Sequence, residues 1–248
     1  MPSPVESVIE VLRHKKVPSV PRGELFVGKD FLHRHFPDLS GDYPGQLLAA
    51  ARRLSLSAIG IDLYADGSRA VFDAGGFGRL EGYFSIGCIN GPFSRLIGAR
   101  GFAGAMMSTR RDPTAFAVIA ERQLREMEES VESAKNNGLQ AIALADDIAG
   151  KKGLLFSPRY FAETILPVYR DMAAMIRGRG LFAFLHSDGD MGDTIGPLIE
   201  AGFDCIHPVD AQGGLDLRAL TLRFGAEVSF MGHLDLFACD ARRIADEV

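Results

Sequence analysis

The sequence contains little cysteine and no long apolar run. Its three cysteines, at positions 88, 205 and 239, form no C-x-x-C pair, so neither a disulfide framework nor a structural zinc knuckle is indicated. This usage fits a reducing cytoplasm. No apolar stretch reaches about 18 residues, so no membrane span is predicted. The first residues, 1–6, carry neither a basic nor an apolar region, so no signal peptide is expected.

Excess positive charge and the common nucleotide-binding motifs are also absent. The chain has 27 Lys and Arg against 32 Asp and Glu, a net charge of −5, which argues against nucleic-acid and anionic-membrane binding. It has no P-loop, G-x-S-x-G or H-E-x-x-H motif. The glycines of 98–104 neither match G-x-G-x-x-G nor follow a strand directly, so no dinucleotide site is predicted.

Short apolar runs alternate with amphipathic stretches along most of the chain. This alternation predicts an α/β fold with a parallel sheet and right-handed crossovers. Six strands are predicted; an open doubly wound sheet fits that count, and so does a (β/α)8 TIM-type barrel with two strands missing. The predicted strands cover 58–63, 84–89, 141–145, 181–185, 203–206 and 228–232, and the helices between them lie near 46–55, 113–136, 158–176, 193–201 and 216–224.

The predicted organisation is an N-terminal helix and arm, residues 1–45, packed on a barrel of residues 46–248. Ser3 and Pro4 begin the helix, and the Pro- and Gly-rich residues 17–45 are expected to be irregular. The chain ends at Val248 in a predicted helix, so we expect a barrel that lacks its last one or two β/α units. Open sheet edges promote association, and a homodimer is therefore expected.

Three predicted strands each end in a histidine followed closely by an aspartate. The pairs are His186 with Asp188, His207 with Asp210, and His233 with Asp235. Residues i and i+2 of a strand face the same side, and the carboxyl ends of barrel strands carry catalytic residues. These pairs are therefore the first candidates for a functional site.

The pair His186 and Asp188 is the strongest of the three candidates. Gly189 follows it and permits a sharp turn, while imidazole and carboxylate are competent Zn²⁺ ligands or an acid/base pair. The alternative hypothesis is structural: His186 forms a hydrogen bond with a backbone carbonyl, and Asp188 or Asp190 caps the next helix. For His207 and Asp210 a structural role or a turn is favoured.

Further carboxylates lie at or near the other strand ends. Asp146 and Asp147 are adjacent, so at most one of them is expected to face a site while the other holds a loop. Asp62 falls within a buried-looking strand, where a carboxylate is costly without a function. Asp235 faces an apolar strand end and is favoured for function on the same ground.

The order and spacing of several loose motifs resemble the uroporphyrinogen decarboxylase superfamily. That family has a (β/α)8 barrel fold and includes tetrapyrrole decarboxylases and zinc-dependent methyltransferases that act with methyl-corrinoid proteins. The likeness runs from about residue 20 to the end of the chain. Its pieces are residues 90–93, 145–148 with 156–161, 185–189, 201–204 with Pro208, and 230–235.

Two departures from the family pattern bear on function. The decarboxylases carry an arginine-rich N-terminal segment, whereas residues 20–25 contain only Arg22, so the chain looks like the methyltransferase branch. That branch often has His-x-Cys at the strand end; here His186 matches and Asp188 replaces the cysteine. A carboxylate makes the site harder and weakens the case for zinc thiolate chemistry.

The resemblance implies a methyltransferase that moves a methyl group to or from a corrinoid protein or a small-molecule acceptor. His186 and Asp188 would hold Zn²⁺, while Asp147 and Asp235 would line the barrel mouth beside Asp188 as catalytic residues. The candidate cofactor-binding residues are Asn90 and Asp210. Two alternatives stay open: a cofactor-free decarboxylase of a tetrapyrrole polycarboxylate, in which Asp62 stabilises a cation, and an inactive barrel fragment that binds a ligand or partner.

Overall fold

The protein's structure is a computed structural model that describes residues 2–38, 43–63, 80, 82–112 and 114–232. Seven strands form one sheet in the order β1-β2-β3-β4-β7-β8-β9, and β5 and β6 form a separate antiparallel pair. The strands are β1 Gly23–Glu24, β2 Ala58–Asp62, β3 Phe84–Asn90, β4 Ala141–Ala145, β5 Ala149–Gly150, β6 Gly153–Leu154, β7 Phe182–His186, β8 Cys205–Val209 and β9 Ser229–Gly232.

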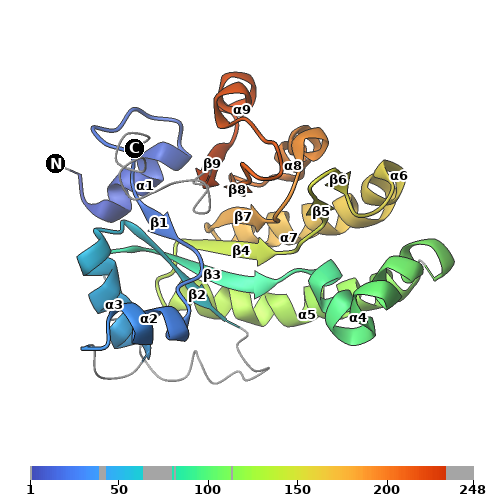
Figure 1. Ribbon diagram of the computed structural model, residues 1–248, viewed down its shortest axis with the longest axis horizontal. Helices are drawn as coiled ribbons and strands as arrows, with labels where there is room; N and C mark the ends of the chain where they lie inside the picture. The colour runs from blue at the N-terminus through green and yellow to red at the C-terminus, as the bar shows by residue number, and fades with distance from the viewer. Residues whose placement is uncertain (1, 39–42, 64–79, 81, 113, 233–248) are drawn as a thin grey trace. The chain divides into compact units, whose positions relative to one another are not determined.

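The sheet confirms the prediction of an α/β fold of the TIM-barrel type. Its seven strands follow one another in the sheet as they do in the sequence (Figure 1). A doubly wound sheet would reverse its strand order at a switch point, and no such reversal occurs among the described strands. The described residues thus hold seven strands of this fold, whereas a complete barrel has eight.

Helices follow most strands, as the alternation predicts. The pattern missed α4, whose sequence contains Gly98, Gly101 and Gly104 and lacks a regular apolar stripe; at Gly101 (φ 68°) it breaks into two helical segments. The helices are α1 Pro4–Leu12, α2 Lys29–His35, α3 Tyr43–Leu54, α4 Pro92–Arg111, α5 Thr114–Asn136, α6 Pro158–Tyr160, α7 Leu166–Gly178, α8 Ile195–Ala201 and α9 Leu217–Phe224, with a π-helical turn at Phe161–Ile165.

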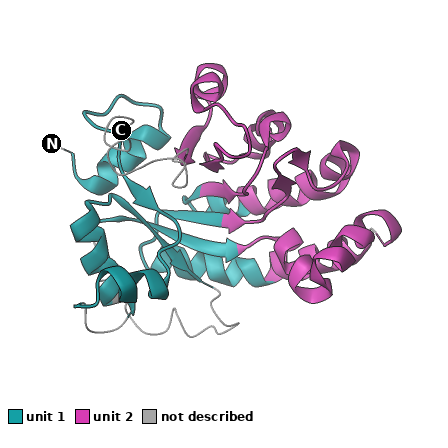
Figure 2. Ribbon diagram, in the orientation of Figure 1, with its two compact units in different colours: residues 1–89, 126–143, 175–182 teal, residues 90–125, 144–174, 183–248 magenta. Residues whose placement is uncertain are grey.

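The chain divides into two compact units, drawn in different colours in Figure 2. The first comprises residues 1–89, 126–143 and 175–182, and the second comprises residues 90–125, 144–174 and 183–248. The carboxyl ends of β4, β7 and β8 therefore belong to the second unit, together with the loops that follow them. The end of β2 belongs to the first unit.

In the first unit, β2 pairs in parallel with β1 and with β3. A Cβ on Gly60 would lie 1.9 Å from the carbonyl oxygen of Leu25, so glycine is needed where the chain leaving β1 passes over β2. The expectation that residues 17–45 are irregular is wrong for β1 and α2. A two-residue strand is too short to show alternation, which is why the sequence pattern missed it.

In the second unit, β8 pairs in parallel with β7 and with β9. The register places His186 beside His207 at the ends of β7 and β8. Buried apolar residues such as Phe184, Leu185 and Ile206 precede these histidines and anchor the strands. The histidines at the strand ends therefore follow directly on strand residues that are packed in the apolar core. Among the described residues, no helix combines the length and apolar character of a membrane span.

Candidate metal site

The two adjacent aspartates after β4 have opposite environments. Asp146 is completely buried, whereas Asp147 is exposed. The Asp146 carboxylate accepts hydrogen bonds from the backbone N–H groups of Phe93 (3.1 Å) and Ser94 (2.5 Å). It also accepts one from the Tyr169 hydroxyl (2.8 Å). This confirms the prediction that one of the two carboxylates holds a loop, here the beginning of α4, while the other stays accessible.

Gly91, directly before α4, makes this contact with Asp146 sterically possible. A Cβ on Gly91 would lie 2.2 Å from the Cβ of Asp146, a distance that no side chain tolerates. The Gly91 N–H donates to the carbonyl of Ala145, the last residue of β4, at 2.7 Å. Two separate hydrogen-bonding contacts therefore fix the end of β4 against the start of α4, and Asp147 projects from this fixed point.

Burial raises the pKa of Asp146 to about 6, although the hydrogen bonds from Ser94, Tyr169 and Phe93 oppose the shift. Burial also raises the pKa of Tyr169 well above its usual value, and the charge of Asp146 adds to this. Tyr169 therefore remains protonated and serves as a hydrogen-bond donor. Asp146 is best described as an anchor, because its carboxylate is enclosed by these donors.

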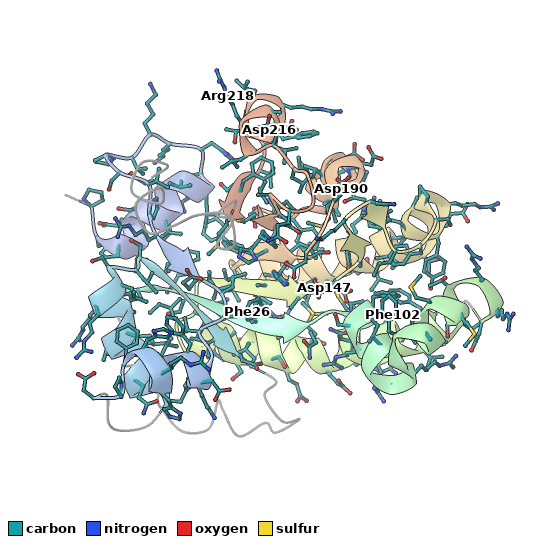
Figure 3. The ribbon with its side chains drawn as sticks, viewed as in Figure 1. Phe26, Phe102, Asp147, Asp190, Asp216 and Arg218 are labelled. Atoms are coloured by element: carbon teal, nitrogen blue, oxygen red, sulfur yellow. The ribbon has the colours of Figure 1, made fainter. Side chains whose placement is uncertain are left out.

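The end of β7 is tied to the end of β4 by backbone and hydroxyl hydrogen bonds. The N–H of Asp146 donates to the carbonyl of His186 at 2.9 Å, and the buried Ser187 hydroxyl accepts from the N–H of Ile148 at 3.0 Å. The N–H of Asp188 donates to Oδ1 of Asp147 at 3.1 Å. The two strand ends are thus held together, and the Asp147 carboxylate contacts the backbone of Asp188. Asp147 is labelled in Figure 3.

Asp147, His186 and Asp188 form the candidate metal site. One potential ligand atom from each residue lies within 4.8 Å of the other two. The Nε2 of His186 is 3.8 Å from Oδ1 of Asp147. Two carboxylates and one imidazole are a donor set that suits Zn²⁺ and related divalent ions. The structure therefore brings together His186, Asp188 and Asp147, three of the residues selected from the sequence.

His207 contacts the other side of the His186 ring. The two Nδ1 atoms are 2.8 Å apart, so one of them donates and the other accepts. Burial lowers the pKa of His207 to about 3, with a further contribution from His186, so its ring is neutral and able to accept. Burial also lowers the pKa of His186, while Asp147 and Asp188 oppose this. When His207 accepts, His186 carries its proton on Nδ1 and leaves the Nε2 lone pair available.

The contact between His186 and His207 was missed by the sequence reasoning, which favoured a structural role for His207. The signal was present, since each histidine ends one of two consecutive predicted strands. Neighbouring parallel strands place such residues side by side. The histidines do pair in the register of β7 and β8. His207 therefore supports His186 through the contact between their Nδ1 atoms.

The two carboxylate oxygens of Asp210 contact the loop after β7 and the loop after β8. Oδ2 accepts from the N–H of Gly189 at 3.0 Å, and Oδ1 accepts from the N–H of Gln212 at 2.8 Å. Gly189 has φ 91°, and a Cβ there would lie 2.8 Å from the backbone of Gly150. Both features require glycine. These contacts fit the turn role considered for Asp210, and its cofactor-binding role stays a prediction.

Asp188 is exposed at the same loop, yet its carboxyl group is partly desolvated. Burial raises its pKa, the charges of Asp147 and Asp210 add to the rise, and His186 opposes it. The negative charges of Asp147 and Asp210 thus both act on Asp188, and the imidazole of His186 lies close to Asp147 and Asp188. A bound cation would offset their mutual repulsion, since an opposite charge favours the ionised form of each carboxyl.

The remaining predicted site residues are not members of this cluster or lie outside the described residues. Asp62 ends β2 in the first unit and is exposed, so the premise that it is a buried carboxylate is wrong. Its side chain follows the buried strand residues rather than lying among them. Asn90 is exposed at the end of β3, and its backbone carbonyl accepts from Gln123 at 2.5 Å. Asp235, like His233, lies outside the described residues.

Residues 82–243, more than half of the chain, match the family model described as uroporphyrinogen decarboxylase (URO-D). The chain belongs to the uroporphyrinogen decarboxylase family. This confirms the resemblance drawn from the motifs. No curated protein matches the chain.

A solved structure also matches the fold of this uroporphyrinogen decarboxylase family member. It is a methyltransferase from Methanosarcina mazei, with a TM-score of 0.62 and 15% sequence identity. The match covers 83% of this chain and 76% of the other. At this identity the likeness establishes the shared fold, and it agrees with the sequential strand order described above.

Proposed function

We propose that the protein is a metal-dependent methyltransferase that moves a methyl group between a corrinoid protein and a small acceptor. The observation that carries the proposal is the cluster of Asp147, His186 and Asp188 at the ends of β4 and β7. The methyltransferase name of the Methanosarcina mazei structure supports it. The single arginine in residues 20–25 also supports this branch over the decarboxylases.

The cluster fits a divalent cation by the chemistry and placement of its donors. Its oxygen and nitrogen atoms lie close enough for one ion to contact all three residues. Asp147, His186 and Asp188 would hold the ion, and Zn²⁺ is the proposed metal. When bound, such an ion lowers the pKa of a thiol or water that it contacts, which supplies a nucleophile near neutral pH.

The residues around the cluster keep its donors in place. When the Nδ1–H of His186 donates to Nδ1 of His207, the Nε2 of His186, 3.8 Å from Oδ1 of Asp147, keeps its lone pair free for a metal ion. The N–H of Asp188 orients Oδ1 of Asp147. The backbone N–H of Asp146 and the hydroxyl of Ser187 hold the ends of β4 and β7 together. Supporting hydrogen bonds of this kind fix ligand orientation and strengthen metal binding.

A zinc-dependent methyl-transfer assay tests the proposal. Protein loaded with Zn²⁺ is mixed with methylcobalamin and 2-mercaptoethanol, and loss of the cobalt–methyl group is followed by absorbance. We expect turnover by the wild type that EDTA abolishes, and no turnover by His186→Ala. Asp193→Asn, a change at an exposed aspartate of the same unit, serves as the control and should retain activity.

The assay also separates this proposal from the alternatives. Turnover that is unchanged by EDTA and by His186→Ala would overturn the metal-dependent mechanism. Metal-free decarboxylation of a tetrapyrrole polycarboxylate would favour the decarboxylase alternative instead. We also propose that a corrinoid protein is the partner that donates or accepts the methyl group. The homodimer, which light scattering would reveal, stays a prediction.

A further inference from the structure

A pocket of about 500 Å³ lies in the second unit between the latter part of α4 and the segment from β6 to α6. Asp147, His186 and Asp188 are not among its lining residues. Its volume falls within the range of about 300–1,000 Å³ that is usual for small-molecule sites. It is therefore a second candidate binding site, separate from the metal cluster.

The latter part of α4 and the segment from β6 to α6 form the two walls of this pocket. After Gly101, the second helical segment of α4 presents Met106 and Met107 to the pocket. Phe156 and Tyr160 line the opposite wall, with their ring centroids 5.4 Å apart. Thioether and aromatic side chains give this surface an apolar and adaptable character.

Tyr160, one of the residues that line the pocket, carries an unsatisfied hydroxyl group. The residue is 9% exposed, and its buried hydroxyl has no hydrogen-bond partner among the described residues. Burial raises its pKa, and the charge of Asp112 adds to this, so the hydroxyl keeps its proton. A buried donor without a partner destabilises the fold. An acceptor that entered the pocket would remove that cost.

Two arginines give the pocket a positive charge. Arg110 and Arg111 line it and are exposed. In the described part of the chain neither has an ion-pair partner, whereas Arg100 pairs with Asp112 at 2.9 Å. The nearby carboxylate is thus already neutralised. Guanidinium groups bind carboxylate, sulfonate and phosphate groups well, because their donors match the oxygens in pairs.

We propose that this pocket binds a small organic anion with an apolar body. The apolar body would pack on Met106, Met107 and Phe156, and the anionic group would contact Arg110 and Arg111. A polar acceptor on the ligand would pair with the Tyr160 hydroxyl. Phe156 also packs on Phe93, with ring centroids 5.1 Å apart, and Phe93 donates to Asp146. The pocket wall is therefore continuous with the anchor of the metal site.

Isothermal titration calorimetry with a charged probe and a neutral probe tests this proposal. The probes are 1-naphthalenesulfonate and 1-naphthalenesulfonamide, both titrated in EDTA so that the result does not depend on the metal site. We expect the sulfonate to bind at least about tenfold more tightly than the sulfonamide, because only the sulfonate forms a charge-assisted hydrogen bond with an arginine. Equal affinities, or no binding of the sulfonate, would overturn the proposal.

Matched variants locate the bound anion. Arg110→Gln and Arg111→Gln should each weaken sulfonate binding, the larger effect reaching about tenfold. Arg170→Gln is the control, because Arg170 is exposed on α7 and also lacks an ion pair in the described residues. If all three variants bound the sulfonate as the wild type does, the assignment to this pocket would be wrong.

Tyr160→Phe tests the part assigned to the unsatisfied hydroxyl. This change removes a buried donor that has no partner, so the unfolding midpoint of the free protein should stay the same or rise. Affinity for the sulfonate should fall severalfold, about threefold to tenfold. Wild-type affinity in Tyr160→Phe would contradict a contact between the anion and this hydroxyl.

Discussion

The carboxyl ends of β2 and β4 both carry aspartates after runs of buried residues, yet their surroundings differ. At β4, Asp146 is enclosed by three donors, and Asp147 lies beside His186 and Asp188. At β2, Asp62 is exposed. Its charge raises the pKa values of Tyr43 and Cys88, in both cases after burial as the main cause.

The difference lies in what the neighbouring elements contribute. β4 is followed in the sheet by β7, whose end supplies His186 and Asp188, and the start of α4 supplies two backbone donors. β2 pairs with β3 so that Asp62 lies opposite Cys88. Asp147 is thus part of the candidate site because β7 and α4 bring complementary groups to the end of β4.

The largest contrast between the two strand ends should be in stability. Asp146→Ala leaves two backbone N–H groups and the Tyr169 hydroxyl buried without an acceptor, so it should lower the free energy of unfolding by at least about 3 kcal/mol. Asp62→Ala should change it by less than about 0.5 kcal/mol, as at other exposed positions. Urea denaturation measures both, and equal losses would refute the contrast.

The second-largest difference between the two strand ends should be in their contribution to metal affinity. Asp147→Asn removes a charged ligand, and we expect the Zn²⁺ affinity to fall at least about 100-fold, since loss of a supporting residue alone costs up to that much. Asp62→Asn removes the same charge from β2 and should leave the affinity unchanged. Competition with a zinc-binding dye gives both values. A similar fall in the two variants would point to a nonspecific effect of charge.

The support that β8 gives to His186 should have a smaller effect. His207→Phe keeps an aromatic ring but removes the Nδ1 acceptor, so Zn²⁺ affinity should fall about tenfold. His207→Asn places an amide near the position of Nδ1 and should restore part of the loss. The same dye competition measures this. If the two variants bound Zn²⁺ equally, the hydrogen bond to His186 would not contribute to binding.

The smallest effect is expected at Cys88, opposite Asp62. Burial is the main cause that raises the pKa of Cys88 to about 12, and Asp62 comes second. Native Cys88 should therefore resist iodoacetamide at pH 8, and Asp62→Asn should accelerate its alkylation by less than about tenfold. Peptide mapping by mass spectrometry follows Cys88 separately. Alkylation of native Cys88 at the rate of the unfolded chain would contradict this.

The fold was largely predictable because its strands are continuous apolar runs with polar ends. All six predicted strands occur, and α1 begins at Ser3 and Pro4 as expected, with Ser3 as its N-cap. Three two-residue strands were missed, because two residues carry no periodicity: β1 of the main sheet, and the pair β5 and β6. The helix α4 was missed because its glycines interrupt the apolar stripe, and Gly101 in fact divides it.

The candidate site was predictable in composition but not in its contacts. A strand period of two placed His186 and Asp188 on one face, and adjacency implied that only one of Asp146 and Asp147 would be accessible. Which of the two is buried depends on Gly91 and the start of α4, which lie more than 50 positions earlier in the chain. Local patterns contain no information on such a long-range contact.

The most direct measurement of the central claim is anomalous X-ray diffraction from crystals of the protein grown with Zn²⁺. The account predicts a zinc peak about 2.0–2.1 Å from the Nε2 of His186 and about 2.0–2.2 Å from a carboxylate oxygen of both Asp147 and Asp188. The Nδ1 of His186 should remain within hydrogen-bonding distance of His207. A zinc peak elsewhere, with none between these three residues, would contradict the account.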